Sequence, residues 1–334
     1  MKKTRASQGR VSRRDFIAAS AMLVAGTRVM AQPPSHPFAV VGLNHVTLGV
    51  SDLRRSLEFY QRLFDLTVYT RQGNGDLPIM TIGSGPQFVA LSQVPSGRAT
   101  GGGIGHHFSV DIEHFDPDRV VSLLAELGVT ARVNMRPAAA QRPLGAPGED
   151  TPELLFGDPD GILLQIQDVR YCGGVGTLGE VCGIPASVTH SSTAAFAVRT
   201  LNHVSIGVSN VERSLQFYRR VFGYAVRTRQ SRGAVPILTI GAGPQFVSLH
   251  EGTRSGHHFC LGIEQFDPDR VMQTLARHGV EARRRTRPSA DQRPPGPPGA
   301  DTPEITFEDP DGFTVQIQDV SYCGGVGPLG NICA

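Results

Sequence analysis

The distribution of apolar and polar residues predicts short strands around two helices in the first half of the chain. The segment 53–64 places apolar residues on one helical face at spacings of three and four, and Ser51 or Asp52 can cap it. A second helix is predicted at 116–128, where Gly128 ends it. Strands that alternate apolar and polar residues are expected on either side of these helices. They lie at 44–50, 67–72, 78–83, 87–92, 106–112, near 131–136, at 152–156 and at 162–168.

The second half of the chain repeats the first, since residues 43–183 align with 201–334. For example, "LNHVTLGVSDLRRSLEFYQRLF" matches "LNHVSIGVSNVERSLQFYRRVF". The repeat is domain-sized and occurs twice, which predicts a duplicated domain and not a solenoid. Each copy should contain two βαβββ units. The expected divisions are a leader at 1–31, a linker at 32–42, domain 1 at 43–172, a Cys- and Gly-rich loop with a linker at 173–200, domain 2 at 201–322 and a Cys- and Gly-rich tail at 323–334.

The N-terminus has the pattern of an export signal. A pair of arginines, Arg13 and Arg14, precedes Phe16 and a modestly apolar stretch, and "VMAQ" supplies small residues around Ala31. This pattern resembles a bacterial twin-arginine signal and predicts a periplasmic or secreted protein that uses the twin-arginine export machinery. The alternative is a disordered basic tail.

Cysteine usage is consistent with export. Four of the five cysteines lie in matching Gly-rich segments, as Cys172 with Cys182 and as Cys323 with Cys333. In an oxidising compartment each pair can close a short loop as a disulfide, which we favour over a soft metal site. Cys260 is left over and is expected to be a small buried residue.

Composition leaves room for two domains and excludes two classes of partner. The chain has 334 residues, of which 40% are hydrophobic. Its formal charge is +2, but the first 31 residues carry about +6, so the remainder is mildly acidic at about −4. We find no basic face for nucleic acid and no apolar run long enough to span a membrane.

Strand parity places three polar side chains of each copy on one face of the predicted sheet. Side chains of a strand point alternately to its two faces, and in three strands the apolar residues share one face. The opposite face then holds His45, His107 and Gln165 in the first copy and His203, His258 and Gln316 in the second. His106 and His257 have the other parity and should pack behind this face, unless a bulge exchanges the adjacent histidines.

These segments resemble the vicinal oxygen chelate superfamily, which includes glyoxalase I, extradiol dioxygenases and bleomycin-resistance proteins. The resemblance rests on "NHVTLGVSDLRRSLEFYQRLF" and on "F-x-DPDG-x-x-x-Q", and it covers both copies. It implies an α+β fold of two tandem domains, each made of paired βαβββ modules that form a half-open mixed sheet around a cavity. It also implies metal ligands on the first, fifth and last strands, which are the positions of the six polar residues named above.

Gln165 and Gln316 depart from the superfamily pattern, which has a glutamate at this position. Two imidazoles and one carboxylate suit Fe(II), Mn(II) or Zn(II), and we favour Fe(II). An amide oxygen is a neutral and weaker ligand. Glu153 and Glu304 are candidate substitute carboxylates, although their position directly after a proline favours a place at the rim.

The second copy carries an extra histidine, His250, where the first copy has Ser92. Parity places His250 on the polar face, near a fourth ligand position that the resemblance implies. The second copy could then offer four ligands, namely His203, His250, His258 and Gln316, and we expect it to bind metal better than the first. His250 and His257 are the candidate catalytic bases.

We therefore expect an exported, metal-dependent enzyme of dioxygenase type that acts on a small substrate with vicinal oxygens, such as a catechol. One alternative is a metal-free binding protein of bleomycin-resistance type. Another is a glyoxalase-like lyase or isomerase, which is less favoured because glutamine cannot accept a proton from carbon. The expected assembly is a monomer or a homodimer.

Overall fold

The computed structural model describes residues 37–73, 76–95, 107–140, 149–182, 194–252, 257–292 and 300–333. The predicted leader at 1–31, most of the linker after the first copy and His106 lie outside the described residues. Within them, the two copies belong to one compact unit.

The first copy has the predicted order of a strand, a helix and three strands, twice over. Its helices are α1 (Leu53–Phe64) and α2 (Pro117–Glu126), and a short 3₁₀ helix spans Ala138–Ala140. Its strands are β1 (Val40–Val50), β2 (Thr67–Gln72), β3 (Leu77–Thr81), β4 (Phe88–Gln93), β5 (His107–Ile112), β6 (Ala131–Arg136), β7 (Thr151–Gly157) and β8 (Leu163–Asp168).

The second copy repeats this order. Its helices are α3 (Val211–Phe222) and α4 (Pro268–Arg277), with short 3₁₀ helices at Ser231–Gly233 and Ser289–Asp291. Its strands are β9 (Val198–Val208), β10 (Val226–Gln230), β11 (Val235–Thr239), β12 (Phe246–Glu251), β13 (His258–Ile263), β14 (Ala282–Arg287), β15 (Thr302–Glu308) and β16 (Thr314–Asp319).

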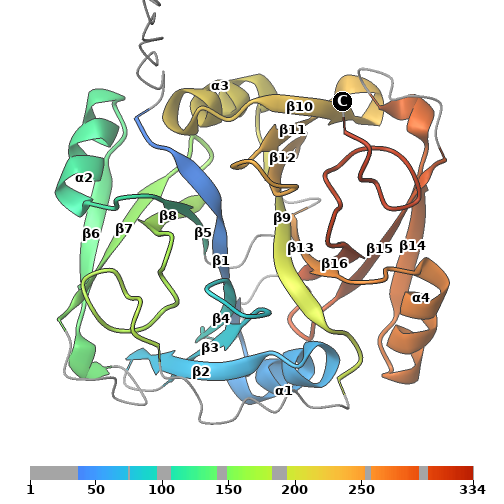
Figure 1. The fold of residues 1–334 in the computed structure, drawn as a ribbon, viewed down its shortest axis with the longest axis horizontal. Helices are drawn as coiled ribbons and strands as arrows, with labels where there is room; N and C mark the ends of the chain where they lie inside the picture. The colour runs from blue at the N-terminus through green and yellow to red at the C-terminus, as the bar shows by residue number, and fades with distance from the viewer. Residues whose placement is uncertain are drawn as a thin grey trace, which may run out of the picture. The chain divides into compact units, whose positions relative to one another are not determined.

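Each copy forms its own eight-stranded mixed sheet. The strand order is β2-β3-β4-β1-β5-β8-β7-β6 in the first copy, and the equivalent β10-β11-β12-β9-β13-β16-β15-β14 in the second. Two βαβββ modules meet where β1 pairs with β5, and the sheet curls into a half-open barrel (Figure 1). The predicted α+β fold of two tandem domains with paired modules is confirmed.

Helix α1 begins and ends where its sequence provides caps. The Asp52 carboxylate accepts a hydrogen bond from the backbone N–H of Arg55 (3.0 Å), which satisfies one of the free donors of the first turn. Asp65 ends the helix in the left-handed conformation, with φ of 53°. Tyr60 and Phe64 lie on the buried face, as the apolar spacing predicts.

The first helix of each copy packs against the other copy. The Tyr60 hydroxyl of α1 donates to the carboxylate of Asp309 (2.8 Å), which belongs to the second copy's DPDG turn. The reciprocal bond runs from Tyr218 of α3 to Asp158 (3.1 Å). Phe59 also lies against Phe307 of the second copy, with 6.3 Å between ring centroids. The DPDG turns therefore join the copies as well as reversing the chain.

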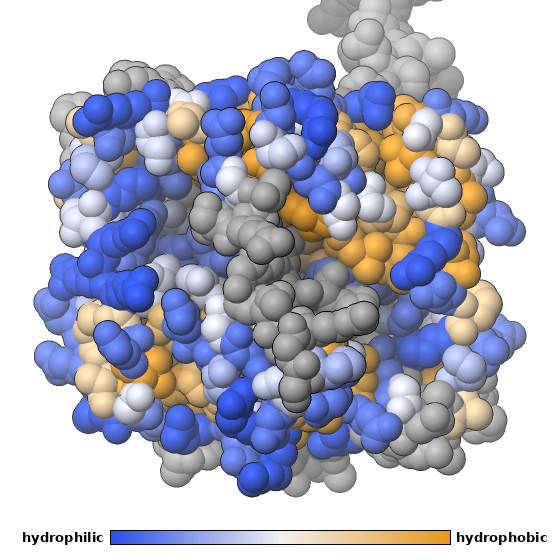
Figure 2. Space-filling view, turned by 180° about the vertical axis from the view of Figure 1, so that it is seen from behind, coloured by the Kyte–Doolittle hydropathy of each residue, from blue (hydrophilic) through white to orange (hydrophobic). Residues whose placement is uncertain are grey.

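One apolar core runs through both copies and fixes the orientation of the sheets. Its central residues come from the predicted apolar faces and are almost fully buried, namely Val46, Phe108 and Leu164 in the first copy and Val204, Phe259 and Val315 in the second. Because these side chains face the core, the polar residues of the same strands face the concave side. Hydrophilic residues cover most of the surface seen from behind, with apolar residues gathered mainly at the upper right (Figure 2).

Candidate metal centre

Two imidazoles converge on the concave side of each sheet. His45 of β1 and His107 of β5 approach with their Nε2 atoms 3.1 Å apart, and their rings are nearly perpendicular. His203 of β9 and His258 of β13 repeat this arrangement with the same 3.1 Å separation. The antiparallel pairing of β1 with β5, and of β9 with β13, brings the two histidines together.

An asparagine before the first histidine holds its ring. In the second copy, Asn202 donates from its amide nitrogen to the Tyr322 carbonyl (2.8 Å), so its amide oxygen is left to accept from His203 Nδ1 (2.9 Å). Asn44 does the same for His45 in the first copy. With the proton on Nδ1, the lone pair of Nε2 points toward the partner histidine. Neither asparagine was among the predicted site residues, although the pair "NH" in both copies was a usable signal.

The first histidine of each pair is buried and is neutral near pH 7. His45 stacks on Phe88 with 4.2 Å between ring centroids, and His203 stacks on Phe246 at the same distance. Burial lowers the pKa of both histidines well below the usual 6.5, and the neighbouring imidazole lowers it further. Neutral imidazole is the form that binds metal ions.

Gln165 and Gln316 lie beside the histidine pairs. Gln316 of β16 is paired through Cys260 with His203 in one row across three strands, and it is 4% exposed. A hydrogen bond with this glutamine opposes the effect of burial on the His203 pKa, so the glutamine side chain lies beside the imidazole. Its Nε2 atom is buried without a hydrogen-bond partner among the described residues. Gln165 repeats both features in the first copy.

The second glutamine of each last strand, Gln318 or Gln167, makes a different contact. Gln318 donates from Nε2 to the Pro303 carbonyl (2.9 Å), and Gln167 donates to the Pro152 carbonyl (3.2 Å). Each bond joins the last strand to its neighbour. The proline carbonyl needs a hydrogen-bond donor, and the glutamine amide supplies it. Only the first glutamine of each pair therefore faces the histidines.

The two concave glutamates do not replace the missing carboxylate. Glu304 accepts from the Arg287 guanidinium (2.8 Å) and from the Tyr322 hydroxyl (3.2 Å). Glu153 is bound in the same way by Arg136 (2.7 Å) and Tyr171 (2.9 Å). Within the described ranges, no group of three or more His, Cys, Asp and Glu side chains is placed to hold a metal ion.

His250 lines the second cavity but does not join the histidine pair. The described residues contain no group of three or more His, Cys, Asp and Glu side chains that could hold a metal ion, so His250 is not gathered with His203 and His258. His250 Nε2 lies 3.1 Å from the Ser205 hydroxyl, and the oxygen of that hydroxyl accepts a hydrogen bond from Ser248 (2.8 Å). The reason is that β12 lies beyond β9 in the sheet, so His250 reaches the serine of β9 first.

The second predicted base, His257, packs beside His250, with 6.4 Å between the ring centroids. His257 is buried, and its Nδ1 accepts from the Gly207 backbone N–H (3.4 Å). It is not among the described residues that line the cavity, so we assign it no catalytic role. Cys260 is fully buried and unbonded to another cysteine, as expected for a small core residue.

A cavity of about 550 Å³ opens in front of the second histidine pair. His203, His258 and Gln316 lie on its wall, together with His250 and Glu304. Such a volume is in the range of small-molecule sites. The His203 and His258 imidazoles and the Gln316 amide therefore form the inner wall of a cavity that is large enough for one small molecule.

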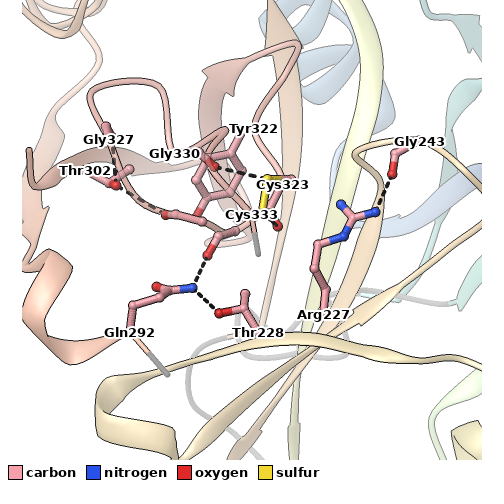
Figure 3. The surroundings of a disulfide bond; sticks show 12 residues. Arg227, Thr228, Gly243, Gln292, Thr302, Tyr322, Cys323, Gly327, Gly330 and Cys333 are labelled. Carbon is pink, nitrogen blue, oxygen red and sulfur yellow. Dashed lines mark hydrogen bonds between the residues drawn. A yellow bond between two sulfur atoms is a disulfide. The ribbon is translucent and has the colours of Figure 1, made fainter. Parts of the chain in front are cut away.

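Each disulfide closes a loop next to the site. Cys172 is joined to Cys182 and Cys323 to Cys333, with Cα–Cα distances of 6.2 and 6.4 Å. The second loop is bound from several sides, since Thr302 donates to the Gly327 carbonyl (2.9 Å) and Gln292 donates to the Gly324 carbonyl (3.0 Å) (Figure 3). A Cβ on Gly325 would lie 2.1 Å from the Ile332 carbonyl, so the tight loop needs glycine there.

The fold and site match one known family. The model of the Glyoxalase/Bleomycin resistance protein/Dioxygenase superfamily matches residues 42–166 and 200–317. The chain therefore belongs to this superfamily, and each of its two copies is one domain of that type. Among curated proteins, none matches the chain in sequence.

Solved structures with the same fold include two kinds of enzyme. The 2,3-dioxygenase LapB from Pseudomonas sp. KL28 is 14% identical with a TM-score of 0.59, covering 84% of this chain and 92% of its own. The homoprotocatechuate 2,3-dioxygenase from Arthrobacter globiformis is 16% identical with a TM-score of 0.59, covering 85% and 81%. The Mn(II)-bound glyoxalase from Novosphingobium aromaticivorans is 15% identical with a TM-score of 0.60, covering 87% and 83%. At these identities the similarity establishes the fold alone.

Proposed function

We propose that the second domain is a metal-dependent centre that acts on a small molecule with two adjacent oxygens, such as a catechol, by dioxygenase-type chemistry. The observation that carries the proposal is the convergence of His203 and His258 at 3.1 Å beside the Gln316 amide, in a cavity of about 550 Å³. The fold shared with two dioxygenases and with a Mn(II)-bound glyoxalase supports it.

The donor set fits a divalent ion. Two nitrogens that bind one ion at ~2.0–2.1 Å and subtend about a right angle lie roughly 3 Å apart, which is comparable to the separation found here. Held by His203, His258 and Gln316, a divalent ion would act as a Lewis acid toward two substrate oxygens, and Fe(II), favoured over Mn(II) and Zn(II), would also allow reaction with dioxygen. Because Gln316 is neutral, the site should bind the ion less tightly than one with a carboxylate.

His250 is the residue that we propose takes a proton from the substrate. It lines the cavity and lies beside the Ser205 hydroxyl, and Ser205 is the cross-strand neighbour of His258 in the backbone register. An imidazole at this position can accept a hydroxyl proton directly or through Ser205. In the first domain the same place holds Ser92, which cannot act as a base at neutral pH.

The proposal is tested by the metal content of the purified, natively exported protein. We expect a divalent metal at up to one equivalent per domain, with the second domain the better filled. His258→Ala should remove the second-domain metal, while the matched His107→Ala should remove only the weaker first-domain share. Elemental analysis of both variants checks this, and unchanged metal content in His258→Ala would refute the assignment. Oxygen uptake with catechols then tests the chemistry.

A metal-free binding protein is the second candidate. It is favoured by the lack, among the described residues, of a carboxylate that could complete the site, since Glu304 is already bound by Arg287. In that case the amides and imidazoles would hydrogen-bond a polar ligand directly. Metal-free protein that binds small polar ligands with unchanged affinity after chelator treatment would support this candidate over the enzyme.

Export to the periplasm or beyond is a further part of the proposal. The twin arginines at 13 and 14 indicate the route, and the two disulfides support an oxidising compartment. None of the helices in the described residues is long and apolar enough to cross a membrane. Replacement of both arginines by lysine should leave the protein in the cytoplasm, as cell fractionation would show.

A further inference from the structure

The second cavity is more polar than the same region of the first domain. At five lining positions the second domain has a hydroxyl, an imidazole or a guanidinium where the first has a smaller or apolar residue. The second-domain residues are Ser248, His250, Arg285, Thr306 and Thr314, and their counterparts are Ala90, Ser92, Asn134, Leu155 and Leu163. The buried histidines, the glutamine and the stacked phenylalanine are the same in both. The two domains therefore have the same residues at the inner wall around the histidines. They differ in the residues that would surround the part of a ligand farther from the histidines.

Two arginines of β14 face this cavity. Arg283 pairs with Thr306, which pairs with Gln316, so these three residues form one row across the sheet. Adjacent strands are ~4.8 Å apart, which places the Arg283 backbone roughly 10 Å from that of Gln316. Arg285 lies on the same face two residues on and pairs with Glu304. Both arginines are exposed, so they stand at the mouth of the cavity.

The two arginines differ in the carboxylates near them, because Arg283 also lines an adjoining cavity that contains Glu281, Glu308 and Asp309, whereas Arg285 lines only the cavity of the histidine pair. Glu304 is the one carboxylate among the described lining residues of the histidine cavity, and it is already bound by Arg287 at 2.8 Å. No ion pair involves Arg283 or Arg285 within the described part of the chain. By contrast, Arg284 points to the opposite face and pairs with Asp269 of α4.

We infer that the ligand of the second domain carries an oxyanion of the carboxylate class, which Arg285 and Arg283 bind while the other end faces the histidine pair. The inference rests on the proposed function for the end that faces the histidines. A guanidinium presents paired N–H donors that match a carboxylate. The first domain, with Asn134 in place of Arg285, lacks part of this recognition.

The competing explanation is that the arginines only protect an edge strand. β14 lies at the end of its sheet, and charged side chains there prevent pairing with other chains. That explanation predicts no difference between Arg284 and Arg285 in ligand binding. The first domain supplies a matched replacement for each, because it has Val133 where the second has Arg284 and Asn134 where it has Arg285.

Calorimetric titration of the mature chain, loaded with redox-inert Zn(II) and kept anaerobic, separates these explanations. The probes are 3,4-dihydroxybenzoate, catechol and benzoate, and the variants are Arg285→Asn and Arg284→Val. We expect wild type and Arg284→Val to bind 3,4-dihydroxybenzoate about tenfold more tightly than catechol, and Arg285→Asn to lose most of that preference. Arg283→Leu should reduce it further.

The outcomes distinguish this inference from the proposed function. Equal affinity of wild type for the acid and for catechol, or a preference that survives in the double variant at Arg283 and Arg285, overturns the inference and leaves the metal centre in place. Binding of benzoate that depends on Arg285, with no binding of catechol, supports the oxyanion site and refutes the vicinal-oxygen function. Failure of all three probes to bind refutes both.

Discussion

At the scale of single residues, the site depends on which of two adjacent amides faces the histidines. Gln316 and Gln318 point to the same side of β16, but Gln318 is bound to the Pro303 carbonyl and Gln316 is turned toward His203. The Nε2 atom of Gln316 is buried without a hydrogen-bond partner among the described residues, which is costly. A cation bound between the histidines would be held by the amide oxygen of the same side chain.

Restoring a carboxylate at this place should tighten metal binding. In Gln316→Glu a negative charge replaces a neutral dipole beside the His203 and His258 imidazoles, so we expect the dissociation constant for Zn(II) or Fe(II) to fall at least tenfold. Competition with a chromophoric chelator measures it. Gln318→Glu is the matched control, because its carboxylate would meet the Pro303 carbonyl and lower stability without raising metal affinity. Equal affinities of wild type and Gln316→Glu would contradict a metal role for this position.

At the scale of elements, the disulfide loop is connected to the histidine pair. The loop starts at Tyr322, whose carbonyl accepts from Asn202, and Asn202 in turn holds the His203 ring. Arg287 also reaches the loop by donating to the Gly325 carbonyl (2.8 Å). The loop thus supports the residues that hold His203, and its covalent closure limits how far these groups can move.

Opening this loop should cost stability. Closing a loop across ten residues restricts the unfolded chain by about 2–3 kcal/mol in the chain-entropy account. We expect Cys323→Ser/Cys333→Ser to lower the free energy of unfolding by about this amount, as measured by urea denaturation followed by circular dichroism. Cys172→Ser/Cys182→Ser should have a similar effect through the first loop. A reducing agent should lower the stability of wild type but not that of the variant in which all four of these cysteines are serine. An equal response of wild type and this variant would contradict the prediction.

At the scale of the whole molecule, the two domains are joined by carboxylates of their DPDG turns. The Asp309 carboxylate accepts a hydrogen bond from the Tyr60 hydroxyl. The Asp311 carboxylate accepts one from the Ser56 hydroxyl (2.9 Å) and forms an ion pair with the Arg55 guanidinium (3.1 Å). Burial raises the pKa of Asp309 from 3.8 to about 6, whereas hydrogen bonds from Ser51 and the other α1 partners outweigh burial and lower that of Asp311. The two turn carboxylates therefore respond to acid in opposite directions.

The raised pKa of Asp309 should make the free energy of unfolding depend on pH. A raised carboxyl pKa means that the folded protein binds a proton more tightly than the unfolded chain, so the contribution of Asp309 is most favourable below pH 4 and is lost as the pH rises through 6. Wild type should therefore gain about 1 kcal/mol over Asp309→Asn between pH 7 and pH 5. Chemical denaturation at both pH values measures this difference.

Asp311→Asn provides the contrast. Because the pKa of Asp311 is lowered below 3.8, its contribution is lost only as the pH falls through that lower value, and it should stay constant between pH 7 and pH 5. A pH-independent difference between wild type and Asp309→Asn would show that the buried carboxyl is not the group that titrates.

The sequence by itself determined the elements, the duplication and the polar face. Alternation on strands such as 44–50 and 162–168 decides which side chains share a face, and this is a local property of the chain. It therefore identified both histidine pairs and the glutamines beside them. Only the tertiary structure decided that Glu304 is bound by Arg287, that His250 contacts Ser205 and that Tyr60 docks on the other domain. Those outcomes depend on strand order and on contacts between segments up to 249 residues apart, for which a single sequence carries no periodic signal.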